Sequence, residues 1–319
     1  MVRTAEVVSP NHPDKICDRI SDALVDEFLT GDSNSRCAIE TVGGHGKIFI
    51  TGEVTSKYKP SDSVIKNIVY NISGVSDITL NISQQSPEIA QGVDTGGAGD
   101  QGIMIGYACN DNKEYVPQEY YLARNLNKEI YKEFPFDGKT QVSLEGKKVR
   151  VVASFQNAPK KDLEKICKAF FKKHKYTVEA LHCNPAGDWS LGGFDADAGL
   201  TGRKIAVDNY GPRVPIGGGA FSGKDATKVD RSGAYMARRM AVDILKKHKD
   251  AKEVLVRLAY AIGYNQPLEV TVIIDGVEGA DIGDYDLSPK GIIEFLELDK
   301  PIFYETSKWG HMGNNFKWL

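Results

Sequence analysis

The sequence lacks the long apolar segments that would place the chain in a membrane or direct it out of the cell. None of its 319 residues lies in an apolar run approaching the roughly 20 residues that span a bilayer. The first nine residues also lack the extended apolar core of a secretory signal. We therefore expect a cytoplasmic protein with no membrane partner.

Cysteine is scarce, and its spacing does not fit the common cysteine-based sites. The five cysteines are odd in number, and no two of them are spaced as Cys-x-x-Cys. This pattern argues against both a disulfide framework and a zinc site. We expect buried, reduced thiols instead. The five are Cys17, Cys37, Cys109, Cys167 and Cys183.

An excess of charge of either sign is also missing. The 40 lysines and arginines nearly balance the 43 aspartates and glutamates, which leaves a formal net charge of −3. No global field would attract nucleic acid or an anionic membrane, so any anion binding must come from local clusters. With 41% apolar and 26% charged residues, the chain has the composition of a globular protein of two or three modules.

What the sequence does contain is a recurring order of predicted elements. Apolar residues at Ile16, Ile20, Leu24 and Phe28 recur every four positions, which predicts an amphipathic helix. Around it, the pattern predicts strand, helix, strand, strand, helix and strand, the order of a split βαβ motif. The predicted ranges of this first copy are 3–8, 11–29, 37–42, 47–55, 61–74 and 77–83.

The same order returns twice along the chain. We therefore predict an α+β fold of three β-α-β-β-α-β pseudo-repeats, built as two-layer sandwiches around a common core, with alternation by chance as the alternative. The predicted domains are residues 1–94, 95–183 and 184–319. The second copy has predicted elements at 103–109, 117–132, 140–144, 148–155, 159–174 and 177–182. The third has them at 204–207, 229–247, 253–261, 268–274, from Ser288, and at 302–304.

Split βαβ repeats also occur in RNA-binding modules. No aromatic strand of the RNP type accompanies them here, and the net charge is slightly negative. We therefore expect no nucleic-acid partner.

Residues 97–102 match the pattern Gly-x-Gly-x-x-Gly. A dinucleotide-binding loop of this kind follows a strand and opens a helix, so that the pyrophosphate meets the helix N-terminus. Here the segment opens a predicted strand instead, which argues against that class. The alternative is a flexible loop whose glycines allow a tight turn, but a turn leaves Asp100 unexplained.

Residues 218–225 nearly match a Walker A loop. Their glycines expose backbone N–H groups, and Lys224 could reach phosphate oxygens. Asp225, however, stands where the loop would carry the Ser or Thr that binds magnesium. The alternatives are a phosphotransferase with a variant loop, or a solvated, charged entrance to the helix predicted at 229–247.

The start of the first predicted helix combines His12, Asp14 and Lys15. An imidazole, a carboxylate and an amine at a helix N-terminus offer partners to an anion and to its metal ion. A lone histidine at this position more commonly caps the helix.

Taken together, five motifs resemble the S-adenosylmethionine synthase family, in order along nearly the whole chain. The resemblance implies methionine adenosyltransferase activity on ATP and L-methionine. The thioether sulfur attacks C5′ of ATP, and the released tripolyphosphate is hydrolysed to pyrophosphate and phosphate. A neutral thioether needs no general base, so the missing Ser-His-Asp set is no defect. The motifs are His12-Pro13-Asp14-Lys15, Gln91-Gly92-Val93-Asp94, and the segments 97–102, 199–204 and 217–225.

The resemblance also implies roles for individual residues. Asp14 and Asp230 would bind magnesium, with two ions in each active site, and Glu40 would bind potassium. The residues implied in catalysis are His12, Lys139, Arg203, Lys224 and Lys228. Those implied in ATP binding are His12, Lys15, Asp137, Lys139, Asp188, Trp189, Asp197, Arg203, Lys204, Ala220 and Lys224. Those implied in methionine binding are Glu53, Gln91, Asp100, Asp197 and Lys228.

Three of these residues keep an alternative interpretation. Glu40 and Glu53 lie in predicted strands and could be outward-facing carboxylates. Trp189 stands where the family usually has a phenylalanine against adenine, and it could instead be a core residue.

The family further implies a homodimer with active sites across the subunit interface, often paired into a homotetramer. In that arrangement, Glu53 and Gln91 would come from one subunit and Lys224 from the other. This chain departs from the family at Thr95-Gly96, where a longer active-site lid is usual, so we expect weaker solvent exclusion and a higher KM. A nucleotide-binding partner without catalysis is the remaining alternative.

Overall fold

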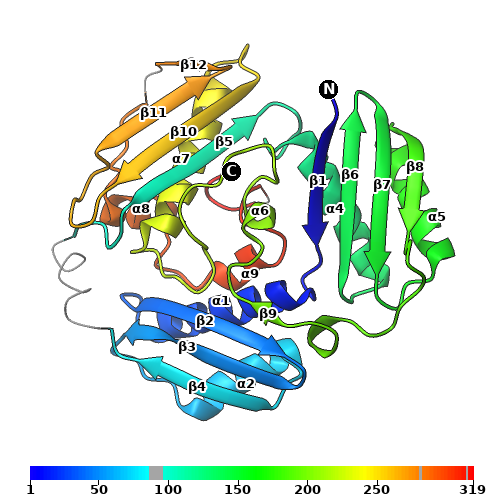
Figure 1. The fold of residues 1–319 in the computed structure, drawn as a ribbon. Helices are drawn as coiled ribbons and strands as arrows, with labels where there is room; N and C mark the ends of the chain where they lie inside the picture. Colours follow the sequence, from blue (N-terminus) through cyan, green and yellow to red (C-terminus); the bar gives the residue numbers. More distant parts are fainter. Residues whose placement is uncertain (86–95, 280–281, 314) are drawn as a thin grey trace.

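The computed structural model describes residues 1–85, 96–279, 282–313 and 315–319. Its strands form three four-stranded sheets, and helices pack on them (Figure 1). The sheets surround a centre that contains α6, α9 and the C-terminus. This is the α+β class predicted from the sequence. The predicted Gln91 lies outside the described residues, as does Thr95 of the shortened connection.

The first sheet has the strand order β4-β3-β2-β9, and α1 packs against β2 and against α2. In β2, burial alternates from Cys37 onward, so one face of the strand points into the core and the other carries Glu40 outward. The elements are α1 (Pro13–Gly31), β2 (Arg36–Gly44), β3 (Lys47–Thr55), α2 (Asp62–Ser73), β4 (Asp77–Ser83) and β9 (Gly199–Leu200).

The second sheet has the order β1-β6-β7-β8, and the third has the order β12-β11-β10-β5. The second contains β1 (Arg3–Val8), β6 (Gly138–Glu145), β7 (Lys148–Phe155) and β8 (Thr177–Cys183), with α4 (Gln118–Glu133) and α5 (Lys160–Lys173). The third contains β5 (Gly102–Cys109), β10 (Glu253–Tyr260), β11 (Glu269–Ile274) and β12 (Val277–Glu278), with α7 (Val229–Lys247) and α8 (Pro289–Leu296).

The first strand of each copy belongs to the sheet of the next copy. β1 pairs antiparallel with β6, β5 pairs with β10, and β9 pairs with β2. Each of the three modules therefore supplies the strand that covers one edge of another module's sheet. The order of elements along the sequence gives no sign of this exchange.

Two strands predicted for the third copy are helices. The segment predicted as a strand at 204–207 forms α6 (Ile205–Asp208), and the strand of this copy comes earlier, as β9. The segment predicted as a strand at 302–304 begins α9 (Phe303–Ser307). Its first amides donate to the carboxylate of Asp26 on α1, which satisfies groups that a helix N-terminus leaves without partners.

All five cysteines are free and buried, as expected. Within the described part of the chain, every helix is too short or too polar to cross a bilayer.

Candidate active site

The N-terminus of α1 presents His12 and Asp14 in a fixed geometry. His12 is the N-cap, and its Nδ1 accepts a hydrogen bond from the backbone N–H of Asp14 at 3.2 Å. Pro13 occupies the first turn, where its missing N–H costs nothing. Asp14 is only 2% exposed, and its Oδ1 accepts from the backbone N–H of Leu200 at 3.0 Å. Backbone bonds therefore orient both side chains.

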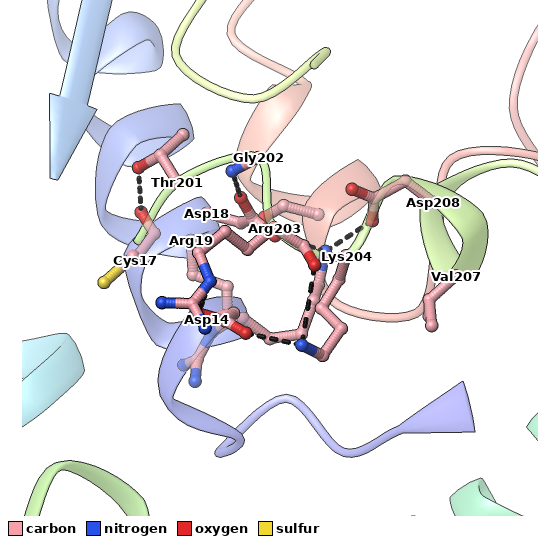
Figure 2. A network of polar contacts seen from close by, with 12 residues as sticks. Asp14, Cys17, Asp18, Arg19, Thr201, Gly202, Arg203, Lys204, Val207 and Asp208 are labelled. Atoms are coloured by element: carbon pink, nitrogen blue, oxygen red, sulfur yellow. Dashed lines mark hydrogen bonds and ion pairs between the residues drawn. The ribbon is translucent and has the colours of Figure 1, made fainter. Parts of the chain in front are cut away.

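Two cations from the loop that follows β9 converge on Asp14 (Figure 2). Lys204 Nζ donates to Asp14 Oδ2, and Arg203 Nε lies 3.5 Å from Asp14 Oδ1. Burial alone would raise the pKa of Asp14, but the hydrogen bonds from Lys204 and Leu200 hold that pKa below its ordinary value. Asp14 is therefore a carboxylate at neutral pH.

His12 is neutral at physiological pH. Burial, and then the nearby charges of Lys204 and Lys139, lower the pKa of His12 to about 4, against the opposing effect of Asp14. Because Nδ1 accepts a hydrogen bond, the ring proton resides on Nε2. The uncharged imidazole can thus donate a hydrogen bond from its Nε2–H to an oxygen atom.

We expect an NMR titration of the His12 imidazole to show a midpoint near pH 4. In the unfolded chain the pKa returns to about 6.5, so the unfolded state binds the proton first as the pH falls. His12 therefore reduces the free energy of unfolding progressively between about pH 6.5 and about pH 4. A midpoint above pH 6 would show that the ring is charged or differently placed.

A cavity of about 440 Å³ adjoins this cluster, within the size range of small-molecule sites. Asn11, Asp137, Gln156 and Gly193 are among its lining residues. Asp137 Oδ2 accepts from the backbone N–H of Gly193 at 3.0 Å, and Gln156 donates to the carbonyl of Ser190 at 2.9 Å. Gln156 was not predicted from the sequence, because a single glutamine after a strand has no distinctive pattern.

A second cluster surrounds the N-terminus of α7. Asp230 Oδ1 accepts from the backbone N–H of Gly219 at 2.7 Å, and Lys224 Nζ lies 2.8 Å from Asp230 Oδ2. Lys228 caps the helix by position and pairs with Asp225 at 2.6 Å. Lys224 and Asp230 thus repeat the pairing of Lys204 and Asp14, with a backbone bond fixing each carboxylate.

Glu53 lies across β2 from Lys224 of the second cluster. Ala38 of β2 forms an isolated bridge with Lys224 and pairs with Glu53 of β3 in the register of the sheet. Glu40 pairs with Thr51, so Glu40 and Glu53 occupy the same outer face of the first sheet. Both carboxylates therefore lie on the outer face of this sheet, and their implied binding roles stay predictions.

The two clusters adjoin each other through their loops. A Cβ atom added to Gly202 would lie 2.5 Å from the Cβ of Ala220, so the loop 199–204 packs directly on the loop 217–224. Gly217 in turn lies against the carbonyl of Ile103 in β5, and Asp100 comes shortly before that strand. The motifs that lie within the described residues therefore meet in one region.

Lys15 does not belong to the accessible part of this region. Its side chain is completely buried, and Nζ lies 2.6 Å from Asp208 and 3.0 Å from Asp18. Burial opposes its charge, but the two carboxylates raise the pKa of Lys15 above its ordinary value. The structure therefore gives Lys15 a structural role, and its implied contact with ATP stays a prediction.

We expect Lys15→Met to destabilise the fold by about 3–5 kcal/mol, because it leaves two buried carboxylates without their cation. Chemical denaturation measures this loss. Lys139→Met is the matched control: that side chain is 45% exposed beside Glu6, so its replacement leaves stability nearly unchanged. Equal unfolding free energies for the two variants would contradict the structural role of Lys15.

Two other predicted ATP contacts have structural partners of their own. Asp188 Oδ1 accepts from the backbone N–H of Lys160 at the start of α5 and from Asn184. Trp189 is half-buried rather than part of the core, and it packs against Gly192 at the cavity wall.

The carboxylates of this region fit a magnesium site shared with substrate phosphates better than a site built entirely from protein ligands. Among the described residues, no group of three or more His, Cys, Asp or Glu side chains gathers to hold a metal ion. Magnesium commonly takes one or two carboxylates together with substrate phosphates. Asp14 and Asp230 suit this role, since each holds a lysine ammonium at one oxygen.

Three family models together match nearly the whole chain. They describe the N-terminal, central and C-terminal domains of S-adenosylmethionine synthetase, and they match residues 1–95, 95–189 and 191–319.

Full-length relatives agree with these models. The S-adenosylmethionine synthase of Rhodospirillum centenum is 40% identical over 98% of this chain and 92% of its own length. That of Pelagibacter ubique is 41% identical over 97% and 92%. The solved structure of an unusual S-adenosylmethionine synthetase from Campylobacter jejuni has a TM-score of 0.86 at 32% identity, over 99% of this chain and 96% of that one. The chain therefore belongs to the S-adenosylmethionine synthetase family and is a methionine adenosyltransferase.

Proposed function

We propose that the chain forms S-adenosylmethionine by holding the polyphosphate of ATP between cations from its two glycine-rich loops. The observation that carries the proposal is the repeated pairing of a lysine with a backbone-held aspartate, Lys204 with Asp14 and Lys224 with Asp230. Each pair places a cation for phosphate oxygens beside a carboxylate for magnesium. The packing of the two loops on each other supports a single shared site.

In the proposed reaction, the sulfur of methionine attacks C5′ of ATP. A sulfur–carbon bond forms, the C5′–O bond breaks, and its electron pair leaves with the tripolyphosphate. The Nε2–H of neutral His12 is suited to donate to the departing oxygen. The sulfur becomes a sulfonium cation, and no proton has to be removed from it.

Lysine and arginine side chains would supply most of the stabilisation of the transition state relative to the bound substrates. Two unit charges about 4 Å apart interact by roughly 4 kcal/mol at an effective dielectric constant of 20, so several of them can lower the barrier considerably. Negative charge builds on the leaving group in the transition state, where fixed cations are most effective. The proposed group is Lys139, Arg203, Lys204, Lys224 and Lys228. The same cations would hold tripolyphosphate during its hydrolysis to pyrophosphate and phosphate.

The proposal assigns the nucleoside to the cavity beside His12. Asp137 forms part of its wall, and Trp189 offers a half-buried aromatic face near Gly192. The remaining proposed nucleotide contacts are Asp197 and Ala220.

Methionine is assigned to the side of the second cluster. Glu53 and Asp100 would hold its amino group, because carboxylates pair with ammonium groups, while Lys228 would hold its carboxylate. Asp197 is a proposed contact to both substrates, and Gln91 stays in the proposal although it lies outside the described residues.

Asp14 and Asp230 would hold magnesium, and Glu40 would hold potassium. When bound, magnesium neutralises charge on the phosphate oxygens and so eases departure of the polyphosphate. The lowered pKa of Asp14 keeps this carboxylate available as a ligand near neutral pH.

The proposal includes a homodimer with active sites at the subunit interface, and a homotetramer of such pairs. The outer face of the first sheet supports it: Val42 and Phe49, directly opposite each other, are 43% and 40% exposed. Exposed apolar side chains that adjoin one another on a sheet face can form part of an interaction surface. Glu40 and Glu53 lie on this face, which would bring them to the interface. We also propose a cytoplasmic location, where ATP and methionine are both available.

A coupled assay tests the proposed reaction course. The enzyme is incubated with ATP, methionine, magnesium and potassium, and S-adenosylmethionine, phosphate and pyrophosphate are measured together. We expect the three products in equal amounts. Accumulation of ADP would point to phosphotransfer instead, and binding of ATP without turnover would point to a non-catalytic protein.

A further inference from the structure

Helix α1 carries four aspartates at every fourth position, which places them on one face of the helix. Each of the four accepts the backbone N–H of a segment far away in the sequence. We call these residues the aspartate column. The bonds are Asp14 with Leu200 at 3.0 Å, Asp18 with Gly202 at 2.8 Å, Asp22 with Gly223 at 2.9 Å, and Asp26 with Phe303 and Tyr304 at 2.9 and 2.8 Å.

The two inner members of the column are completely buried and neutralised by buried cations. Asp18 lies 3.0 Å from Lys15 Nζ, and Arg231 donates to both oxygens of Asp22 at 2.6 and 2.9 Å. Charge-assisted bonds in a dry environment are strong and tolerate little displacement. The backbone N–H groups of Gly202 and Gly223 are therefore held in fixed positions relative to α1.

Each inner aspartate holds a loop next to a proposed polyphosphate cation. Gly202, held by Asp18, directly precedes Arg203 and Lys204 (Figure 2). Gly223, held by Asp22, directly precedes Lys224. Asp26, at the C-terminal end of the column, instead holds the start of α9, where none of the proposed substrate contacts lies.

We propose that Asp18 and Asp22 are positioning residues for adenosyl transfer, which fix the loops that carry Lys204 and Lys224. The inference rests on the proposed roles of those two lysines. Both aspartates are buried, so they act through the loops they hold. Misplacement of a catalytic group by about 1 Å can cost on the order of 10²-fold in rate, so loss of such an anchor reaches the chemistry.

The test compares alanine and asparagine at three positions of the column. Asparagine keeps an oxygen that accepts the loop amide, whereas alanine removes it. We expect Asp18→Ala and Asp22→Ala to lower kcat/KM for ATP by about 10-fold or more. Asp18→Asn and Asp22→Asn remove a carboxylate partner from Lys15 and Arg231, respectively, and so lower the melting temperature, but while folded they are expected to stay within about threefold of wild type. Asp26→Ala and Asp26→Asn are the matched controls. Both are expected within about twofold of wild type, although Asp26→Ala lowers the melting temperature.

All variants are assayed at a temperature where circular dichroism shows them folded, so that instability alone cannot lower the rate. Equal losses at Asp18, Asp22 and Asp26 would show that the column only stabilises the fold and would overturn the proposal. Unchanged kinetics in Asp18→Ala and Asp22→Ala would overturn it as well. Full activity of Lys204→Ala would instead contradict the proposed role of that lysine.

Should the alanine variants fail to fold, Thr201→Val tests the first loop without touching a buried charge. The Thr201 hydroxyl lies 2.8 Å from Ser21 on α1 and accepts from the backbone N–H of Thr41 at 3.0 Å. We expect a fall in kcat/KM of about fivefold or more, together with faster hydrogen exchange in residues 199–204. Wild-type kinetics with faster exchange in that loop would overturn the proposal.

Discussion

Lys224→Ala is expected to reduce the rate of S-adenosylmethionine formation by about 10²-fold or more while the protein stays folded. Lys224 is 26% exposed and lies against Asp230, so it is accessible to a polyphosphate. Asp230 keeps the hydrogen bond from Gly219 when the lysine is removed, which preserves the loop. The initial rate of product formation and the melting temperature measure the two parts of this expectation.

Lys290→Ala is a suitable control for Lys224→Ala. Its side chain is 82% exposed on α8 and pairs only loosely with Glu294, at 3.8 Å. We expect wild-type turnover from this variant. Turnover of Lys224→Ala close to that of Lys290→Ala would remove Lys224 from the mechanism.

Asp14→Asn is expected to lower turnover by about 10²-fold and to raise the magnesium concentration needed for half-maximal rate. The asparagine oxygen can still accept from Leu200, so the loop stays attached to α1. The missing charge weakens a magnesium site formed by one protein carboxylate and substrate phosphates. Initial rates measured against magnesium concentration test this expectation.

Asp275→Asn provides the comparison for Asp14→Asn. Asp275 accepts from the backbone N–H groups of Lys252 and Glu253, and the asparagine oxygen can keep those bonds. Its magnesium dependence should match wild type. The same magnesium dependence in Asp14→Asn as in wild type would contradict the assignment of Asp14 as a metal ligand.

The elements were predictable from the sequence where local chemistry decides them. The four-residue apolar period over α1 and the cap at His12 are local signals, and the helix appears where they predict it. The segment 302–304 shows the limit of such signals. Its apolar residues suit a strand, but Asp26 of α1 caps it as a helix from far away in the sequence.

The candidate site divides in the same way. Motif spacing brought out Asp14, Lys204 and Lys224, because glycine-rich loops with cations are recognisable in one dimension. The burial of Lys15 could not be predicted, since Asp208 reaches it across 193 positions of the sequence. The exchange of first strands between the sheets could not be predicted either. It depends on which edge strands pair, and the alternation of apolar and polar residues along one strand does not show its partner.

Calorimetric binding of tripolyphosphate in the presence of magnesium tests most directly whether both loops hold one anion. We expect wild type to bind it, and Lys204→Ala and Lys224→Ala each to bind it at least about 10-fold more weakly. Affinity equal to wild type in either variant would contradict the account, because that lysine would then take no part in holding the polyphosphate.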